Sequence, residues 1–484
     1  MSAVRIFFRW LLWSGLLLIA IPSVLVGILM TESGSAWLLR QVPEMVKPLG
    51  IEFAVDGIQG SLLSRLELKG VRAESDGIRF HAGRLLLQWR PAATVNRSLH
   101  VQAIELSDVQ LKLPVPVESA ATALEIPDIV LPMVVQLDRL LLERIVIEQG
   151  ETRFSIIQTA LAAKLDAREL SLRELRYSGG GVQLEGALSM QSSAPHTLAG
   201  ELSVHIDETL MGDEFGVVNA NAVLVGPALK PAFDLRLSAP AELRLRGSLN
   251  LDQPQPGFDL AAEWLVLNWP LQGPPIVTTQ TGHLTLKGVE SDYQLELRTK
   301  VNGEGIPAGS INLTGQGDLK GVKLQPLGVS VLDGQITING NLAWDRMVRW
   351  DLEVLADGID PGRYHPDWPG RINGKMSVSG SLDSKSTGKL TVQTNIHNLG
   401  GELRGYEISA SGGLNYQAGE LRVKAFALTS GPNLVYLDGR ADEHLDLSFD
   451  VKAPDLTSLF PGLSGRLEGS GRLQGTSAEP VIQA

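Results

Sequence analysis

Seven residues near the end of the chain, Leu445-Asp446-Leu447-Ser448-Phe449-Asp450-Val451, alternate strictly between apolar and polar side chains. Successive side chains of a β-strand point to opposite faces, so this pattern predicts a strand with one apolar and one polar face. The same alternation recurs at Leu243, Leu245, Leu249 and Leu251, at Leu284 and Leu286, and at Leu295 and Leu297. The sequence therefore predicts a sheet with one apolar face.

Turn-forming pairs such as Asp56-Gly57, Asp333-Gly334 and Asn339-Gly340 separate the alternating segments at hairpin spacing. The pattern predicts about 30 strands in a long antiparallel meander. Between Val101 and Leu113 the alternation slips twice by one residue, and we interpret each slip as a β-bulge. Residues 126–144 fit either a strand or a helix.

A sheet with so many apolar faces and almost no helices to cover them is expected to curl on itself, because large exposed apolar patches drive association. We predict an all-β fold, a long curled antiparallel sheet shaped like a trough, with an apolar groove. The alternative is a packed sandwich or solenoid whose core is filled. The predicted groove lining is Leu243, Leu245, Leu249, Leu284, Leu286, Leu295, Leu297, Leu445, Leu447, Phe449 and Val451.

The N-terminal region has a different composition. Residues 10–30 are 21 consecutive positions without a charge, preceded by Arg5 and Arg9. This length spans a bilayer, and the charge placement predicts a transmembrane helix with residues 1–9 in the cytoplasm. Residues 31–50 have the spacing of a membrane-proximal helix that ends near Pro48 and Gly50. Residues 51–484 are then expected to form the β-groove on the far side of the membrane.

Composition excludes several classes of function. The net charge is -12 with acids and bases interspersed, which argues against nucleic acid, since a phosphate-binding surface needs a concentrated basic face. The chain has no cysteine, which suits an oxidising compartment and excludes thiol nucleophiles and Cys-based zinc sites.

No catalytic, cofactor or metal site is expected. In the glycine clusters Gly315/Gly317/Gly321 and Gly469/Gly471/Gly475 the last glycine is one position too late for a dinucleotide loop. The eight histidines lack the spacing of metal ligands, and no G-x-S-x-G motif occurs. Adjacent carboxylates such as Asp442 and Glu443 would face opposite sides of a strand. We interpret the polar, aromatic cluster Asp360, Pro361, His365, Asp367 and Trp368 as a structural corner.

Short motifs at both ends of the chain resemble the TamB family, in the AsmA-like group of bridge-like lipid transfer proteins. The N-terminal motifs are residues 57–63, 66–71 and 87–91, with sequences GIQGSLL, LELKGV and LQWRP. Those near the C-terminus are residues 431–433, 437–439, 453–456, 461–465 and 471–476. Between them, Asp360-Pro361 and residues 368–370 also fit.

The resemblance implies a periplasmic groove, anchored in the bacterial inner membrane, that carries phospholipids to the outer membrane. It also implies a partner, the outer-membrane barrel protein TamA of the BamA-like insertase family. The alternative is a scaffold that assists the insertion of outer-membrane proteins. Family members are much longer, so we expect this chain to be an N-terminal fragment without the region that meets the outer-membrane partner. The sequence leaves open the lipid species, the direction of transport and the energy source.

Overall fold

The computed structural model describes residues 31–47, 50–114, 125–129, 132–150, 152–212, 215–345, 347–383, 389–476 and 479–483. The predicted transmembrane helix at residues 10–30 and the preceding nine residues lie outside these ranges. No helix within the ranges is long and apolar enough to cross a bilayer.

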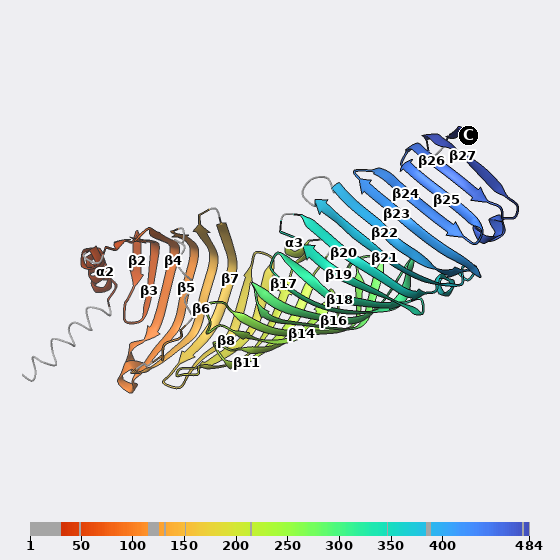
Figure 1. The fold of residues 1–484 in the computed structure, drawn as a ribbon. Helices are drawn as coiled ribbons and strands as arrows, with labels where there is room; N and C mark the ends of the chain where they lie inside the picture. The colour runs from red at the N-terminus through yellow and green to blue at the C-terminus, as the bar shows by residue number, and fades with distance from the viewer. Residues whose placement is uncertain are drawn as a thin grey trace, which may run out of the picture. The chain divides into compact units, whose positions relative to one another are not determined.

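The chain forms two compact units (Figure 1). The N-terminal unit comprises residues 1–240 and 249–254, and the C-terminal unit residues 241–248 and 255–484, so that β13 (Leu243–Asn250) is divided between them. The described residues form 28 strands, which confirms the predicted all-β class.

Within its described residues, the N-terminal unit has one helix packed on a sheet, together with two short helical turns. Its elements are α2 (Glu32–Val46), β1 (Glu52–Ala54), β2 (Gly57–Gly60), β3 (Arg65–Ser75), β4 (Ile78–Arg90), η2 (Pro91–Asn96), β5 (Ser98–Leu113), β6 (Val134–Gln149), β7 (Thr152–Leu165), β8 (Glu169–Gly179), β9 (Val182–Gln191), β10 (Thr197–Ile206), α3 (Glu208–Met211), β11 (Val218–Pro227) and β12 (Ala232–Ala239).

The C-terminal unit contains strands joined mostly by tight turns. Its elements are β14 (Gly257–Trp269), β15 (Val277–Val289), β16 (Asp292–Gly303), β17 (Ile306–Asp318), β18 (Gly321–Val331), β19 (Gly334–Ala343), β20 (Val348–Ile359), η3 (Pro361–Arg363), β21 (Gly370–Asp383), β22 (Lys389–Leu403), β23 (Tyr406–Gln417), β24 (Glu420–Ser430), β25 (Asn433–Arg440), β26 (His444–Ala453), η4 (Leu456–Ser458), β27 (Leu467–Thr476) and β28 (Pro480–Gln483).

Strand pairing follows the predicted meander except between β5 and β6 and at the start of the sheet, where β1 and β2 both pair with β3. From β6 to β12 and from β14 to β28 each strand pairs antiparallel with the next. Strands β5 and β6, however, are parallel. The purely antiparallel prediction was wrong here, because parallel neighbours need a crossover of a dozen or more residues, and residues 114–133 provide that length.

The ambiguous segment at residues 126–144 is not helical in its described part. Its C-terminal half enters β6, which continues to Gln149. Its run of three leucines, Leu140-Leu141-Leu142, fits a helical spacing as well as a strand, which explains the ambiguity.

Of the two predicted bulges in β5 only the first is present, because the β4–β5 and β5–β6 registers are the same on both sides of Asp108. Gln88 pairs with Ala103 and Trp89 with Val101, so one residue of β5 is extra. At the second slip Asp108 has a φ of 56°. Arg144 on the adjacent β6 has a φ of 51°, and its guanidinium pairs with the Asp108 carboxylate at 2.6 Å. Aligned irregularities of this kind bend neighbouring strands together and so curve the sheet.

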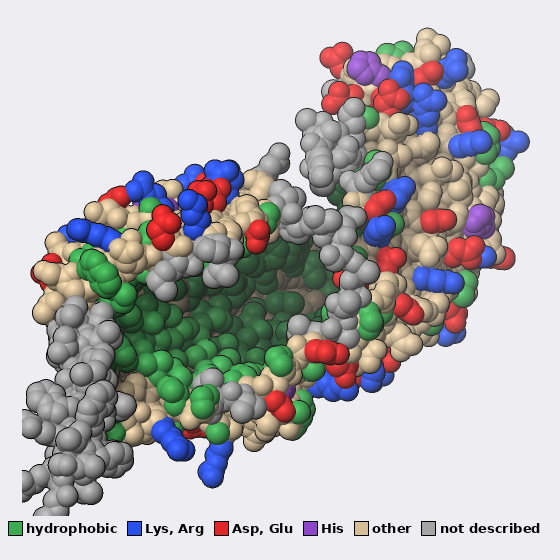
Figure 2. Space-filling model, turned by 90° about the vertical axis from the view of Figure 1, so that its left-hand side faces the viewer, with side chains coloured by type: hydrophobic (Ala, Val, Ile, Leu, Met, Phe, Trp, Pro, Cys, Tyr) green, Lys and Arg blue, Asp and Glu red, His purple; other side chains and the backbone are tan. Residues whose placement is uncertain are grey.

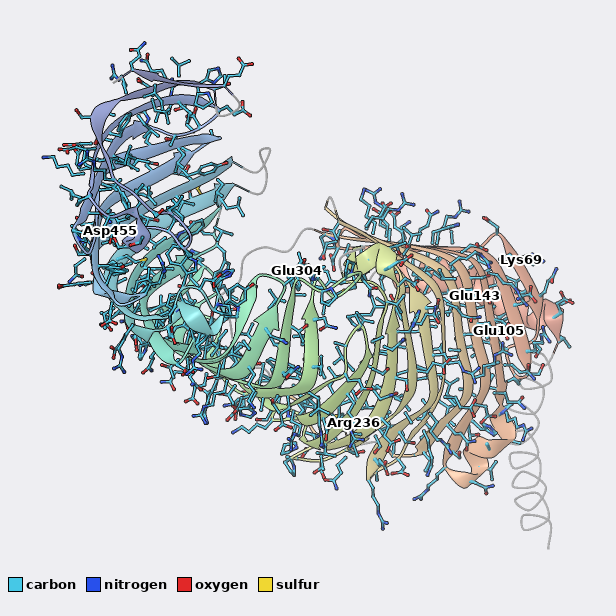
Figure 3. The ribbon with its side chains drawn as sticks, turned by 90° about the vertical axis from the view of Figure 1, so that its right-hand side faces the viewer. Lys69, Glu105, Glu143, Arg236, Glu304 and Asp455 are labelled. Carbon is cyan, nitrogen blue, oxygen red and sulfur yellow. The ribbon has the colours of Figure 1, made fainter. Side chains whose placement is uncertain are left out.

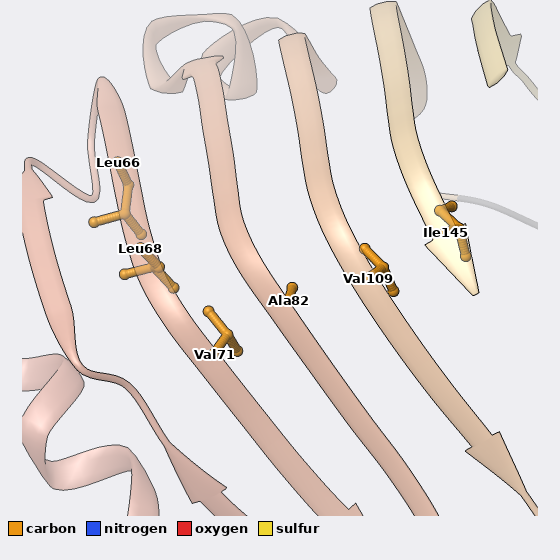
Figure 4. Packing of buried hydrophobic residues seen from close by; sticks show 6 residues of the cluster. All are labelled: Leu66, Leu68, Val71, Ala82, Val109 and Ile145. Atoms are coloured by element: carbon orange, nitrogen blue, oxygen red, sulfur yellow. The ribbon is translucent and has the colours of Figure 1, made fainter. Parts of the chain in front are cut away.

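The main core of the N-terminal unit lies on the inner face of β3–β6, the face that bears the apolar residues. Its buried members are Leu66, Leu68, Val71, Ala82, Val109 and Ile145 (Figure 4). Leu39 of α2, together with Phe53, Val55 and Ile58 from the β1–β2 region, packs against them. The helix predicted at residues 31–50 is therefore confirmed as α2, and it covers part of the sheet.

Side-chain hydrogen bonds fix α2 at both its start and its contact with the sheet. The Thr31 hydroxyl accepts the Gly34 N–H at 3.1 Å and caps the helix. Ser35 is fully buried, and its hydroxyl accepts the Leu62 N–H at 2.9 Å. Pro43 lies inside the helix, near its C-terminal end.

Candidate functional site: the apolar inner face

On the inner face of the N-terminal unit, one row of directly opposed residues crosses ten strands, from β3 to β12. None of its members is charged, and all but one are apolar or aromatic. The row is Leu68, Leu85, Leu106, Leu142, Thr159, Tyr177, Leu184, Val204, Ala220 and Leu237.

The C-terminal unit has a corresponding row across fourteen strands, from β14 to β27. It is again free of charge, with glycine at three places. The row is Leu260, Leu286, Leu295, Gly315, Leu324, Gly340, Leu352, Val378, Thr394, Leu414, Val423, Gly439, Leu447 and Leu473. An uncharged and mainly apolar stripe therefore runs across the strands within this unit.

Several of the predicted lining residues lie in this row or beside it. Leu286, Leu295 and Leu447 belong to the row itself, and Leu284 pairs with Leu297 in the row beside it. Phe449 lies opposite Leu437 and Gly471. Leu243, Leu245 and Leu249 all lie in β13, where they are half-buried.

Exposure on the inner face distinguishes an open surface from a filled core. Among the eleven predicted lining residues only Leu447, at 8% exposure, is buried, and the others are half-buried. A filled core would bury such leucines almost completely. Figure 2 shows a hollow lined with hydrophobic side chains on the side of the N-terminal unit. The inner surface is thus accessible in part to a ligand.

Glycines on the inner face make room for the few large aromatic side chains. Trp264 lies across Gly282 on the neighbouring strand, where an added Cβ would come within 1.8 Å of the indole. Trp350 lies across Gly380 in the same way. Indoles that lie flat against the sheet leave the space above it unfilled.

The same geometry explains the glycine clusters that superficially resemble nucleotide loops. Gly315 and Gly317 are strand residues opposite Leu295 and Tyr293. An added Cβ at Gly317 would lie 3.0 Å from the Tyr293 hydroxyl. These glycines therefore accommodate neighbouring side chains on a sheet.

The opposite face is mainly polar. Figure 3 marks Lys69, Glu105 and Glu143 on β3, β5 and β6. On this face the Arg84 guanidinium donates to Glu67 at 3.0 Å and holds the pKa of that carboxyl below its usual value. This face is not wholly polar, because Leu86 and Leu141 lie opposite Glu105 on it and are buried, at 3% and 8% exposure.

The cluster predicted as a corner has the hydrogen bonds of one. The Asp360 carboxylate accepts the N–H groups of Gly362 at 3.0 Å and Gly370 at 2.9 Å, which caps η3. Trp368 packs edge-to-face against Phe460. No group of three or more histidine, aspartate or glutamate side chains among the described residues is arranged to hold a metal ion.

The similarity between the corners at Asp360 and Asp455 was not identified from the sequence alone. Asp455 caps η4 by accepting the Thr457 N–H at 3.1 Å, as Asp360 caps η3. Each aspartate is followed ten residues later by a Gly-Arg pair, at Gly370-Arg371 and Gly465-Arg466. This shared spacing was the signal that could have identified a repeated hairpin unit.

These features define an all-β protein built on a mainly antiparallel sheet. The chain belongs to the TamB family. The family model described as "TamB, N-terminal domain" matches residues 21–123 and 115–484. A curated relative, "Translocation and assembly module subunit TamB" of Haemophilus influenzae, is 26% identical over 352 residues, which cover 69% of this chain. The match covers about a quarter (26%) of that relative's length. No solved structure matches the chain.

Proposed function

We propose that this chain is part of an inner-membrane-anchored periplasmic bridge that conducts phospholipids towards the outer membrane along its apolar inner face. The observation that carries the proposal is the uncharged row across fourteen strands, most of which is only half-buried. Acyl chains would slide along this row while head groups stay in water at the open side. No residue has a catalytic role in this mechanism.

The uniform chemistry of the row supports conduction over tight binding. Burial of apolar surface is favourable by roughly 25 cal/mol per Å² and has no directional preference. A lipid that moves by one strand spacing therefore exchanges one set of leucine contacts for an equivalent set. No charged side chain interrupts either row, so no position requires an acyl chain to pass a desolvated charge.

A role in the translocation and assembly module, the complex for which the Haemophilus relative is named, is consistent with this proposal. We further propose an outer-membrane barrel of the BamA-like family, TamA, as the partner. A scaffold that feeds outer-membrane strands by edge pairing is less well supported. Strands β3–β11 are paired on both sides, and the edge formed by β1 and β2 consists of only three and four residues.

The experiment places a photo-crosslinking amino acid at single positions of the full chain in cells. The photo-crosslinking amino acid at Phe449 or Leu297, on the inner face, should capture phospholipid. The same amino acid at the matched neighbours Asp450 and Arg298, on the outer face of the same strands, should capture no phospholipid. Equal lipid capture on both faces would contradict the proposal, and so would capture of outer-membrane polypeptides in place of lipid.

A second variant tests conduction separately from binding. Phe449→Asp places a carboxylate on the half-buried inner face, where it can draw water without unfolding the strand but forms a polar barrier to acyl chains. The protein should stay folded, and lipid captured at Leu297 should change several-fold. Lys452→Asp, on the outer face of the same strand, is the control. A folded Phe449→Asp protein with unchanged lipid capture would count against the groove.

A further inference from the structure

A polar depression lies on the outer face of the C-terminal unit, over β22–β27. Its volume is about 700 Å³. Four of its lining side chains are cationic and two are acidic, although the chain as a whole carries a net charge of -12. The cationic residues are Arg422, Lys424, Arg440 and Arg472. Gly413 lies opposite both Asn395 and Lys424, and its missing side chain leaves space between them.

The centre of the depression contains an unfavourable pairing. Arg422 lies directly opposite Arg440 on the neighbouring strand. Like charges in this position destabilise a sheet. The pair belongs to an outer row of fourteen polar residues across β14–β27, and it is the only directly opposed like-charged pair in that row. The row is Asp259, Lys287, Gln294, Gln316, Lys323, Asn341, Asp351, Ser379, Gln393, Asn415, Arg422, Arg440, Asp446 and Gln474.

Of the two carboxylates of the depression, only Asp446 lies directly opposite one of these arginines, Arg440. Asp446 pairs with Arg472 at 3.0 Å, and Asp438 accepts the Ala425 N–H at 2.8 Å. The nearest carboxylate oxygens to Arg422 and Arg440 belong to Glu420 and Asp442, each at 3.8 Å, beyond hydrogen-bond distance. The Lys424 ammonium has no ion pair with any described residue.

We propose that this depression binds a phosphate group, held between Arg422 and Arg440 with Lys424 beside it. Guanidinium groups present paired donors that match phosphate oxygens, and an ammonium adds a point charge. The side-chain amides of Asn395 and Asn415 supply further donors. The site lies on the face opposite the apolar row and does not depend on the lipid-conducting function. A soluble phosphoester and a phospholipid head group share the required chemistry.

The test measures binding of glycerol 1-phosphate to the full chain by calorimetry, at fixed ionic strength set with sodium chloride. Arg422→Gln should weaken binding at least tenfold. Without phosphate, the same variant should be as stable as the natural chain or more so, because it removes the like-charge contact. Arg298→Gln, on the outer face of β16, is the control and should bind normally. Vesicles of phosphatidylglycerol and of phosphatidylcholine then distinguish a head group from a soluble ligand.

Three outcomes would overturn the proposal. One is no detectable binding of glycerol 1-phosphate or of phosphatidylglycerol vesicles to the natural chain. Another is equal binding by the natural chain and Arg422→Gln, which would indicate a non-specific anion effect. The third is an Arg422→Gln chain that is less stable without phosphate, since Arg422 would then have a structural role.

Discussion

The inner face of β3–β6 and the inner face of β14–β27 have the same alternating sequence pattern but differ in cover. In the first, Leu68 is 6% exposed and Val71 is 3% exposed, and Leu39 of α2 packs against their cluster together with Phe53, Val55 and Ile58 from the β1–β2 region. In the second, Leu286 and Leu297 are half-buried, whereas Leu324 and Leu447 are buried, at 4% and 8% exposure. Strand periodicity decides which side chains face inward, and what packs over them decides whether they form a core or a surface.

The largest expected contrast comes from placing one carboxylate in each region. Val71→Asp buries an unpaired charge in the covered cluster, and we expect the N-terminal unit to lose at least about 3 kcal/mol of stability. Leu297→Asp leaves its carboxylate within reach of water, and we expect a loss below about 1.5 kcal/mol. Urea unfolding monitored by circular dichroism measures both. Similar losses would remove the distinction between the two regions.

A smaller effect is expected where a side chain of the inner face packs against a glycine of the neighbouring strand. Gly282→Ala would place a Cβ within 1.8 Å of the Trp264 indole and displace it, at a cost of about 1–3 kcal/mol. Gly400→Ala is the matched control, because its nearest atom is 3.6 Å away, the Ile408 carbonyl oxygen. Tryptophan fluorescence and thermal unfolding report both changes. Unchanged fluorescence in Gly282→Ala would show that the indole does not lie against this glycine.

The contribution of α2 to covering the core can be tested by removing the hydrogen bond of Ser35. Ser35→Ala leaves the buried Leu62 N–H without its hydrogen-bond partner, and we expect a loss of about 1–2 kcal/mol, confined to the N-terminal unit. Ser33→Ala, an exposed position on the same helix, should change stability little. Hydrogen exchange at β2 and β3 follows the local effect. If exchange there is unchanged, α2 does not hold the cover in place.

The smallest effect is a pH dependence of stability that arises from an ion pair on the outer face of β3 and β4. The pKa of Glu67 is lowered from its usual value of 4.5 by the hydrogen bond from Arg84. A lowered folded-state pKa stabilises the fold above the unfolded-state value, and this contribution is lost as pH falls below about 4.5. Glu67→Gln should reduce the acid sensitivity of the N-terminal unit slightly. An identical pH profile in the variant would exclude this pair as a contributor.

The sequence predicted well which side chains of each strand face inward, because this alternation depends only on neighbouring residues. The slip from Leu106 to Val109 is visible in the sequence, but its interpretation as a bulge was wrong, because Asp108 has a φ of 56° with no extra residue in the register. The parallel pairing of β5 and β6 could not be predicted, since it depends on a crossover between distant segments. The outer-face depression was missed for a similar reason. Arg422 and Arg440 are eighteen residues apart and meet only through strand register.

Single-cysteine labelling tests most directly whether the C-terminal inner face is open and the β3–β6 face covered, because the chain contains no cysteine of its own. Cysteine would replace Leu68, Leu297 or, as an exposed control on the outer face of β16, Lys300. We predict that Leu297→Cys reacts with a small maleimide at a rate close to that of Lys300→Cys, while Leu68→Cys is protected until the protein unfolds. Protection of Leu297→Cys equal to that of Leu68→Cys would show a filled core and contradict the open groove.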